Sequence, residues 1–380
     1  MIRGPWKTEL HSYEDARAAA QRYLPWMVFD YIDGAAGTGA GEARNRAALR
    51  SIRLTPRVLR DVSTRDLSTT VFGQQCKVPF GIAPMGMCNL SRPGADLMLA
   101  KIAAQHNVPI GVSTVASTSL ETMHKTSDGK AWFQLYFSGD GTGTERLVQR
   151  AKDAGYKTLI VTLDVPEVGR RPRELRRGFK MPFKIGVPQF IDFALHPQWA
   201  LGSLIAGKPD MANFTEPGWE FDRTESRARA NWSFLARIRD IWDGNLVAKG
   251  VCHVGDALKL RDAGVDAIQV SSHGGRQLDS GVPPIEALRD IRDAVGPDYP
   301  LFYDTGVRSG EDIVKAYVHG ASFVFLGRGM QFACAAGGAA GLAQYWNLLQ
   351  QDVSITMAQL GCTTIEELKQ VQSERSKADG

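Results

Sequence analysis

The stretch Ala267-Ile268-Gln269-Val270-Ser271-Ser272-His273-Gly274-Gly275-Arg276 changes character in its middle. Residues 267–270 are apolar and predict a buried strand. The polar half that follows contains a histidine, which titrates near neutral pH, and an arginine, whose planar guanidinium pairs with carboxylates. Two glycines between them let the backbone approach a ligand closely. This pattern is typical of an active site at a strand end, although a solvated surface turn has the same composition.

Seven further apolar runs of similar length occur in the chain, and amphipathic segments separate most of them. The eight predicted strands are residues 80–83, 109–112, 132–135, 158–161, 246–249, 267–270, 301–303 and 322–326. The predicted helices between them are residues 96–105, 120–125, 144–154, 256–263, 285–294 and 310–318. Strands that alternate with helices predict a parallel sheet, and eight strands within about 250 residues favour an α/β fold of the (β/α)8 TIM-barrel type.

An open, doubly wound sheet is the alternative fold. Such a sheet would carry a G-x-G-x-x-G turn after its first strand. The first apolar run here continues instead as Ala83-Pro84-Met85-Gly86-Met87. The closed barrel is therefore the preferred prediction.

The whole chain, residues 1–380, is expected to form one domain with additions to the barrel. The expected parts are an N-terminal helical cap at 1–77, the barrel at 78–356 with an insertion at 166–245 after the fourth strand, and a C-terminal tail at 357–380. Helices are predicted in these parts at 13–24, 42–51, 232–242, 341–356 and 364–377, and no strand is expected in the cap.

Composition excludes several classes of function. The net charge of +4 is mild, and no nucleic-acid-binding signature occurs. The five cysteines are scattered without a C-x-x-C pair, which argues against a zinc site and a disulfide framework and favours the cytosol. No cluster of metal ligands, signal peptide or transmembrane run is present, so neither a metal nor a membrane-spanning segment is expected.

Polar side chains follow seven of the eight predicted strands. Active sites of barrels lie at the carboxyl ends of the strands, so these side chains are expected to share one site. The loops after the seventh and eighth strands are the usual phosphate site of barrels, and they contain Gly306, Arg308, Gly327 and Arg328. A phosphorylated cofactor or substrate is therefore predicted there.

Two further strand-end residues suggest chemistry. Lys249 is placed to stabilise negative charge on a bound ring. Asp304 is expected to pair with His273 and to stabilise the protonated imidazole.

Residues 271–279 resemble the S-N-H-G-G-R-Q-L-D signature of the FMN-dependent 2-hydroxy-acid oxidising enzymes, which include glycolate oxidase, L-lactate dehydrogenase and mandelate dehydrogenase. The resemblance covers nearly the whole chain. Further matches are residues 82–84, 133–136, 169–171, 247–250, 304–308 and 327–328. The resemblance implies bound FMN, oxidation of an L-2-hydroxy acid to the 2-oxo acid, electron transfer to oxygen, quinone or a redox protein, and a homotetramer.

The resemblance also implies roles for individual residues. His273 resembles the base that removes a proton, from oxygen in a hydride route or from carbon in a carbanion route. Arg276 and Arg171 resemble the pair that holds the substrate carboxylate, helped by Tyr31, and Tyr136 matches a tyrosine near the substrate hydroxyl. The remaining catalytic matches are Asp304, which would support the histidine, and Asp164, which would tune the site. The FMN matches are Pro84, Met85, Gly86, Ser113, Gln134, Thr162, Lys249, Ser271, Asp304, Gly306, Arg308, Gly327 and Arg328.

The chain departs from the family pattern at four positions. Ser272 stands where asparagine is commoner, and Thr305 stands where glycine or serine is commoner. Val115 stands where glycolate oxidase has a tryptophan, which predicts room for a substrate bulkier than glycolate, such as lactate or mandelate. Gly86 stands where several oxidases have alanine, which leaves both an oxidase and a dehydrogenase open.

The insertion bears on the electron acceptor. It opens with a basic cluster that consists of Arg170, Arg171, Arg173, Arg176, Arg177, Lys180 and Lys184. The run 195–199 resembles a loop of the membrane-associated lactate and mandelate dehydrogenases. Peripheral membrane contact through residues 170–205 is therefore expected, and a solvated lid over the active site is the alternative.

Two other functions fit parts of the pattern. An FMN-dependent barrel isomerase, or an oxidoreductase for another substrate class such as a hydroxy-lactone, would use the same phosphate loops but would not need the two arginines. A non-catalytic flavin-binding protein would not need His273.

Overall fold

The computed structural model describes residues 9–137, 141–179, 185–207, 209–214, 226–371 and 373–375. Lys180 and Lys184 of the predicted basic cluster and the last residues of the predicted tail lie outside these ranges.

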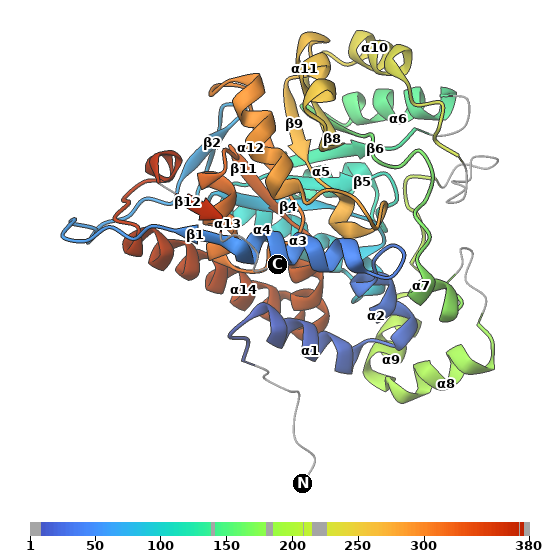
Figure 1. Cartoon of the computed structure of the whole chain (residues 1–380). Coiled ribbons are helices and arrows are strands. Elements are labelled where there is room, and N and C mark those ends of the chain that lie inside the picture. The colour runs from blue at the N-terminus through green and yellow to red at the C-terminus, as the bar shows by residue number, and fades with distance from the viewer. Residues whose placement is uncertain are drawn as a thin grey trace.

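Eight parallel strands close into a barrel in the order β10-β11-β4-β5-β6-β7-β8-β9 (Figure 1). The strands are β4 (Phe80–Met85), β5 (Ile110–Ser113), β6 (Ala131–Leu135), β7 (Thr158–Thr162), β8 (Asn245–Val251), β9 (Ala267–Val270), β10 (Leu301–Tyr303) and β11 (Phe323–Leu326). The predicted barrel is confirmed, and the alternative of an open sheet is wrong. Each predicted apolar run lies in one of these strands because residues that are buried on both faces read as continuous apolar runs.

Helices cover the outside of the barrel. They are α4 (Ala95–His106), α5 (Leu120–Thr126), α6 (Thr142–Asp153), α11 (Val254–Asp262), α12 (Pro284–Val295), α13 (Gly310–Val318) and α14 (Arg328–Gln359). Inside, the rings of Trp132, Phe302 and Phe325 lie with centroids 5.4–5.8 Å apart. Aromatic side chains thus fill the barrel, and a ligand can enter only at its rim.

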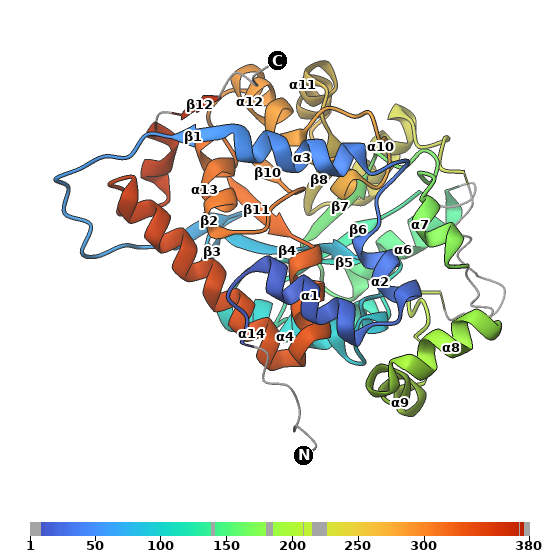
Figure 2. The ribbon, with the colours of Figure 1, turned by 60° about the horizontal axis from the view of Figure 1, so that its bottom comes forward.

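The N-terminal cap contains both helices and short strands. Its helices are α1 (Tyr13–Tyr23), α2 (Trp26–Asp33) and α3 (Ala40–Ser51), and α1 lies along α14 (Figure 2). The expectation of no strands was wrong, because β1 (Ile52–Leu54), β2 (Thr69–Val71) and β3 (Gln74–Cys76) occur there. Phe72, in the turn between β2 and β3, packs its ring 5.5 Å from those of Trp132 and Phe302 and so closes one end of the barrel.

The C-terminal tail differs from the prediction. Residues 364–377 were expected to be helical, but a short 3-10 helix covers Glu366–Gln370 and a strand, β12, covers Ser373–Arg375. β12 pairs antiparallel with β1 from the cap. The helical periodicity of the tail was misleading because a partner more than 300 residues away in sequence determines its conformation.

In its described residues the insertion contains four helices, of which the last packs against α6 outside the barrel. These are α7 (Pro172–Arg176), α8 (Val187–Leu195), α9 (Pro197–Ala206) and α10 (Trp232–Ile241). α8 and α9 form a hairpin near α2 and α7, to one side of the barrel (Figures 1 and 2). The carboxylate of Asp192 accepts hydrogen bonds from the amides of Trp26 and Met27, at 3.0 and 3.2 Å, and so caps α2. The indole of Trp199 donates to the carbonyl of Leu90 at 2.7 Å, which attaches α9 to the barrel.

Candidate active site

One cavity opens at the carboxyl ends of the barrel strands, and it brings most of the predicted residues together. The predicted residues that line it are Tyr31, Pro84, Met85, Gly86, Ser113, Val115, Tyr136, Arg171, Lys249, His273, Arg276, Asp304, Gly306, Arg308, Gly327 and Arg328. Four predicted residues, Gln134, Thr162, Asp164 and Ser271, do not line it. These four lie behind the wall and support residues that do.

Hydrogen bonds connect this supporting layer to the wall. The hydroxyl of Ser113 donates to the side-chain oxygen of Gln134 at 3.0 Å, and the Gln134 amide donates to Thr162 at 2.9 Å. The ammonium of Lys249 donates to the hydroxyl of Ser271 at 2.9 Å, and that hydroxyl donates to Asp304 at 2.5 Å. The polar groups of adjacent strands are therefore held in fixed orientations at the rim.

The loop after β9 has an unusual backbone. His273, Gly274 and Gly275 all have left-handed conformations, with φ of 55°, 66° and 73°. A Cβ on Gly275 would lie 2.9 Å from the backbone nitrogen of Glu42, so only glycine fits there. The conformation of His273 is uncommon for a non-glycine residue, and strained residues of this kind concentrate at functional sites.

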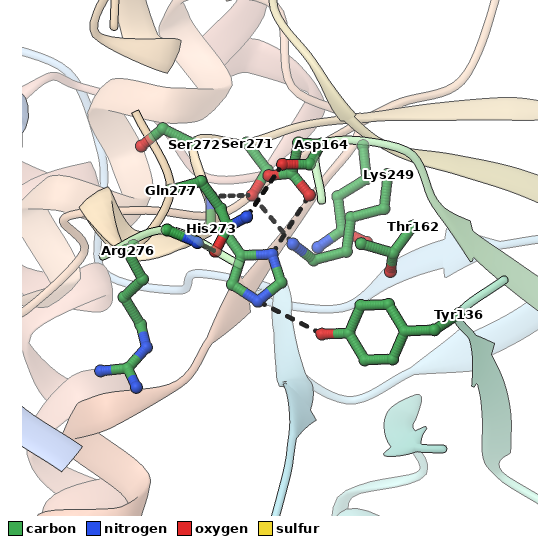
Figure 3. Close-up of polar contacts among 12 residues, drawn as sticks. Tyr136, Thr162, Asp164, Lys249, Ser271, Ser272, His273, Arg276 and Gln277 are labelled. Carbon is green, nitrogen blue, oxygen red and sulfur yellow. Dashed lines mark hydrogen bonds and ion pairs between the residues drawn. The ribbon is translucent and has the colours of Figure 1, made fainter. Parts of the chain in front are cut away.

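The His273 imidazole lies between a carboxylate and a phenol (Figure 3). Its Nδ1 is 3.2 Å from Oδ1 of Asp164, and its Nε2 is 3.3 Å from the hydroxyl of Tyr136. The predicted pairing of His273 with Asp304 is wrong, because no hydrogen bond or ion pair joins the two in the described part of the chain. Asp304 instead accepts from Gln269 and Ser271 and lies 3.2 Å from Nζ of Lys249.

Backbone geometry explains how Asp164 reaches the histidine. The pairing of β8 with β9 shifts register after Lys249, and Gly250 has φ of 95° at this bulge. A Cβ on Gly250 would collide with the Asp164 carboxyl group. The glycine at the bulge therefore makes room for Asp164 beside His273.

The protonation states of the residues around His273 suit a role of its imidazole as a base. Burial lowers the pKa of His273 below its ordinary value, Asp164 opposes this effect, and Lys249 and Arg171 add to the lowering. Burial would raise the pKa of Asp164, but His273 and Lys249 hold it below its usual range. Burial also raises the pKa of the Tyr136 phenol, which keeps its proton. At neutral pH the site thus presents an unprotonated imidazole beside an ionised carboxylate.

Lys249 remains charged although it is buried. Burial would lower its pKa, but the carboxylates of Asp304 and Asp164 outweigh this effect and raise it. The site therefore holds an ion pair at Lys249 beside a neutral imidazole that faces a carboxylate at His273.

The two predicted carboxylate-binding arginines share a buried counter-charge. Nη2 of Arg276 donates to Oε1 of Glu174 at 2.7 Å, and Nη1 of Arg171 lies 3.6 Å from the same oxygen. Arg276 also donates to the carbonyls of Tyr31 and Gly34, at 2.8 and 2.7 Å. These contacts fix Arg276 against α2, so the cap, and not only the barrel, shapes this part of the cavity.

The prediction missed three charged residues, and one of them, Glu42 of α3, lines the cavity and forms an ion pair with Arg308. Glu174 lies three residues after Arg171 at the start of α7, and this helical spacing is a signal that could have revealed it. Arg227 is 5% exposed, lines the cavity and lies 5.2 Å from the Tyr136 ring centroid. No sequence signal marked Arg227, because it belongs to the long insertion.

The far end of the cavity is built to hold an anion. The half-buried guanidinium of Arg328 donates to the carbonyls of Ile32, Gly34 and Gly274, at 2.8–3.1 Å. Partial burial and the nearby Arg276 lower its pKa. Among the described residues Arg328 has only these neutral hydrogen-bond partners, and a cation of this kind suits an anionic group such as a phosphate. Groups of residues suited to a metal ion are absent from the described ranges.

A family model described as FMN-dependent dehydrogenase matches residues 20–374. The chain belongs to this family. The predicted cofactor, FMN, is thereby confirmed, and the observed residues fit it. Arg328 and Arg308 would hold the phosphate, and Lys249 and the rim of β4 would contact the ring.

Similar proteins share both the sequence and the fold of this FMN-dependent dehydrogenase. The chain is 36% identical to (S)-mandelate dehydrogenase of Pseudomonas putida over 366 residues, which cover 94% of this chain and 92% of that protein. A crystal structure described as the monotopic membrane protein (S)-mandelate dehydrogenase superimposes with a TM-score of 0.90 at 36% identity, covering 96% of this chain and all of that one. Mandelate oxidase superimposes with a TM-score of 0.84 at 35% identity, covering 96% and 99%.

Proposed function

We propose that the protein oxidises an L-2-hydroxy acid with an aromatic side chain, of the mandelate type, to the 2-oxo acid. The observation that carries the proposal is the position of His273, whose Nε2 faces the cavity that Arg171 and Arg276 also line. A substrate that bridges these groups would place its carboxylate at the arginines and its hydroxyl-bearing carbon near the imidazole. Relatives named for mandelate support this substrate class.

The residues divide the chemical work. The oxidation removes two electrons and two protons from the substrate, and His273 takes one of these protons at Nε2. Asp164 stabilises the imidazolium that results, because its ionised carboxylate is 3.2 Å from Nδ1. Arg171 and Arg276 orient the carboxylate so that the substrate has a single pose. When bound, FMN supplies the acceptor for the two electrons and for the second proton.

The shape of the cavity favours a large substrate side chain. Val115, Met211 and Phe179 form an apolar part of its wall. A Cβ on Gly86 would lie 2.6 Å from Val115, so the glycine preserves this space. An aromatic ring would bury its surface against these side chains.

The test is anaerobic mixing of the yellow holoprotein with glycolate, L-lactate, (S)-mandelate and (R)-mandelate. Loss of flavin absorbance is expected to be fastest with (S)-mandelate and slowest with glycolate and (R)-mandelate. No loss with any of the four acids would overturn the proposal. Admission of air afterwards distinguishes an oxidase, which regains colour quickly and forms peroxide, from a dehydrogenase.

We further propose that the α8–α9 hairpin docks on a membrane surface. Its apolar side chains point away from the protein: Val187, Phe190, Ile191, Leu195, Leu201, Leu204 and Ile205 are 54–86% exposed. The only titratable side chains of the hairpin, Asp192 and His196, are each 9% exposed and face inward. An apolar face this large suits a lipid surface, and the monotopic membrane structure that the chain resembles supports this partner.

The basic cluster contributes less than its sequence suggests. Arg173 and Arg177 form ion pairs with Asp30 of α2, Arg173 also pairs with Asp33, and Arg171 lies in the cavity. The docking proposal therefore rests on the exposed apolar side chains of the α8–α9 hairpin and not on the basic cluster. Within the described ranges, the chain has no helix of the length and apolarity that crossing a bilayer requires.

Co-sedimentation with phosphatidylglycerol–phosphatidylethanolamine vesicles tests the docking proposal. The double variant Leu204→Gln/Ile205→Gln should remain in the supernatant, whereas the native protein should sediment. The matched control is Val58→Gln/Leu59→Gln, which changes two equally exposed apolar residues in the cap and should sediment like the native protein. Equal sedimentation of all three proteins would overturn the proposal.

The homotetramer that the family resemblance implies stays a prediction.

A further inference from the structure

Thr305 has a backbone conformation that threonine rarely adopts. It follows β10 between Asp304 and Gly306, and its φ is +93°. This region favours glycine, and a β-branched side chain makes it especially unfavourable. A residue that keeps such a conformation normally compensates for the strain with an interaction that glycine cannot make.

The hydroxyl of Thr305 makes that interaction. It accepts hydrogen bonds from the amides of Ser272 and Gly274, each at 3.2 Å, and it donates to Oδ1 of Asp304 at 2.8 Å. The two amides flank His273 on either side. The hydroxyl therefore ties the left-handed loop that carries His273 to a carboxylate of the adjacent strand.

Other contacts hold the loop as well, because the carbonyls of Gly274 and Gly275 accept hydrogen bonds from Arg328 and from the amide of Ala36. The amide of His273 donates to the hydroxyl of Ser271 at 3.0 Å, and the side chain of Asn45 donates to the hydroxyl of Ser272 at 2.9 Å. Ser272 and Thr305, two of the four positions where the chain departs from the family pattern, are in direct contact with each other. The backbone of Thr305 is itself held, because the phenol of Tyr303 donates to its carbonyl at 2.8 Å.

We propose that Thr305 is a positioning residue, which holds the loop of His273 through its hydroxyl at the expense of a strained backbone. The inference rests on the proposed role of His273 as the base. Glycine at this position would relieve the strain but release the loop. Loop position matters for the rate, because an imidazole displaced by about 1 Å loses much of its reactivity.

Three variants separate the hydroxyl from the strain. Thr305→Ser keeps the hydroxyl, Thr305→Val keeps the branched shape without it, and Thr305→Gly removes both hydroxyl and strain. In the holoenzyme, Thr305→Ser should retain kcat within about threefold, whereas Thr305→Val and Thr305→Gly should lose about tenfold or more with KM unchanged. Thr305→Gly should nevertheless unfold at a higher temperature than Thr305→Val. Thr122→Val, in an exposed turn of α5, is the control for replacing a threonine by valine away from the loop of His273.

Two readouts separate positioning from a merely structural role. The acidic limb of the pH profile of kcat/KM should shift in Thr305→Val and should keep its native position in Thr305→Ser. The reason is that the contact between His273 and Asp164 depends on the position of the loop. Amide hydrogen exchange of a peptide that covers residues 272–276 should be faster in Thr305→Val and Thr305→Gly than in the native protein.

The exchange measurement needs no substrate, so it still tests the inference if the protein proves inactive toward 2-hydroxy acids. Unchanged exchange and unchanged kcat in Thr305→Gly would overturn the inference. Equal loss of kcat in Thr305→Ser and Thr305→Val would also overturn it.

Discussion

The two halves of the cavity are built differently. His273, Asp164, Tyr136 and Lys249 come from strand ends of the barrel, and each contacts a side chain from the end of another barrel strand. The arginine half is assembled from α7, the loop after β9 and the cap helix α2, and its centre is Glu174. In the proposed reaction the first half, called the proton half below, accepts a proton, and the arginine half binds the substrate carboxylate. The difference indicates that the rate and the affinity of the proposed reaction can be changed separately.

The largest expected effect is on the proton half. His273→Gln should lower kcat by about 10³-fold, because it removes the imidazole that accepts the proton in the proposed reaction. Binding of phenylacetate, which lacks the reacting hydroxyl, should change by less than about threefold, because the arginines remain in place. Stopped-flow flavin reduction measures the first quantity and calorimetric titration the second. A comparable loss in the rate of flavin reduction and in the affinity for phenylacetate would mean that the two halves do not act separately.

The next largest effect is on the arginine half. Arg276→Lys should raise the Kd for phenylacetate and the KM for substrate by roughly 100-fold, because an ammonium cannot reproduce the planar fork that contacts Glu174, Tyr31 and Gly34 together. The kcat at saturating substrate should fall much less. Arg261→Lys on α11, outside the cavity, is the matched control. A fall in kcat as large as the rise in KM would contradict the division between the halves.

A third effect concerns the pH dependence of the proton half. Asp164 raises the pKa of His273 against the lowering effect of burial, so Asp164→Asn should lower that pKa further. The acidic limb of kcat/KM, along which activity falls as His273 becomes protonated, should therefore move to lower pH. The plateau rate should fall by roughly 30-fold, because a weaker base accepts the proton less readily. Movement of the limb to higher pH would contradict the assignment of Asp164.

Asp304→Asn is the comparison for this third effect. Asp304 pairs with Lys249 and not with His273, so the limb should move less than in Asp164→Asn. A larger movement in Asp304→Asn would mean that the pairing expected from the sequence operates in solution.

The sequence predicted the proton half better than the arginine half, for a physical reason. Parallel strands end at one rim, so residues such as Lys249 and His273 could be placed together from their positions after apolar runs. The partner of His273 was predicted wrongly, because the bulge at Gly250 decides which carboxylate reaches it. The positions of Glu174 and Arg227 depend on helices and loops of the insertion, where no regular pattern relates sequence to space. The β1–β12 pairing was missed because its two strands are more than 300 residues apart in sequence.

The smallest expected effect is on the binding of phenylacetate by variants of Glu174. Its direction distinguishes two roles for this residue. Glu174 is buried, with a side chain 5% exposed, and its carboxylate lies 2.7 Å from Arg276 and 3.6 Å from Arg171. If Glu174 only holds the arginines, every substitution should weaken the binding of phenylacetate. If its charge also competes with the ligand carboxylate, Glu174→Gln, which keeps a hydrogen-bonding oxygen, should bind phenylacetate roughly threefold to tenfold more tightly. We expect tighter binding in Glu174→Gln and weaker binding in Glu174→Ala, because the alanine variant also loses the hydrogen bond that orients Arg276. Calorimetric titration of the two holoproteins decides the point: weaker binding in both would show that Glu174 acts through geometry alone.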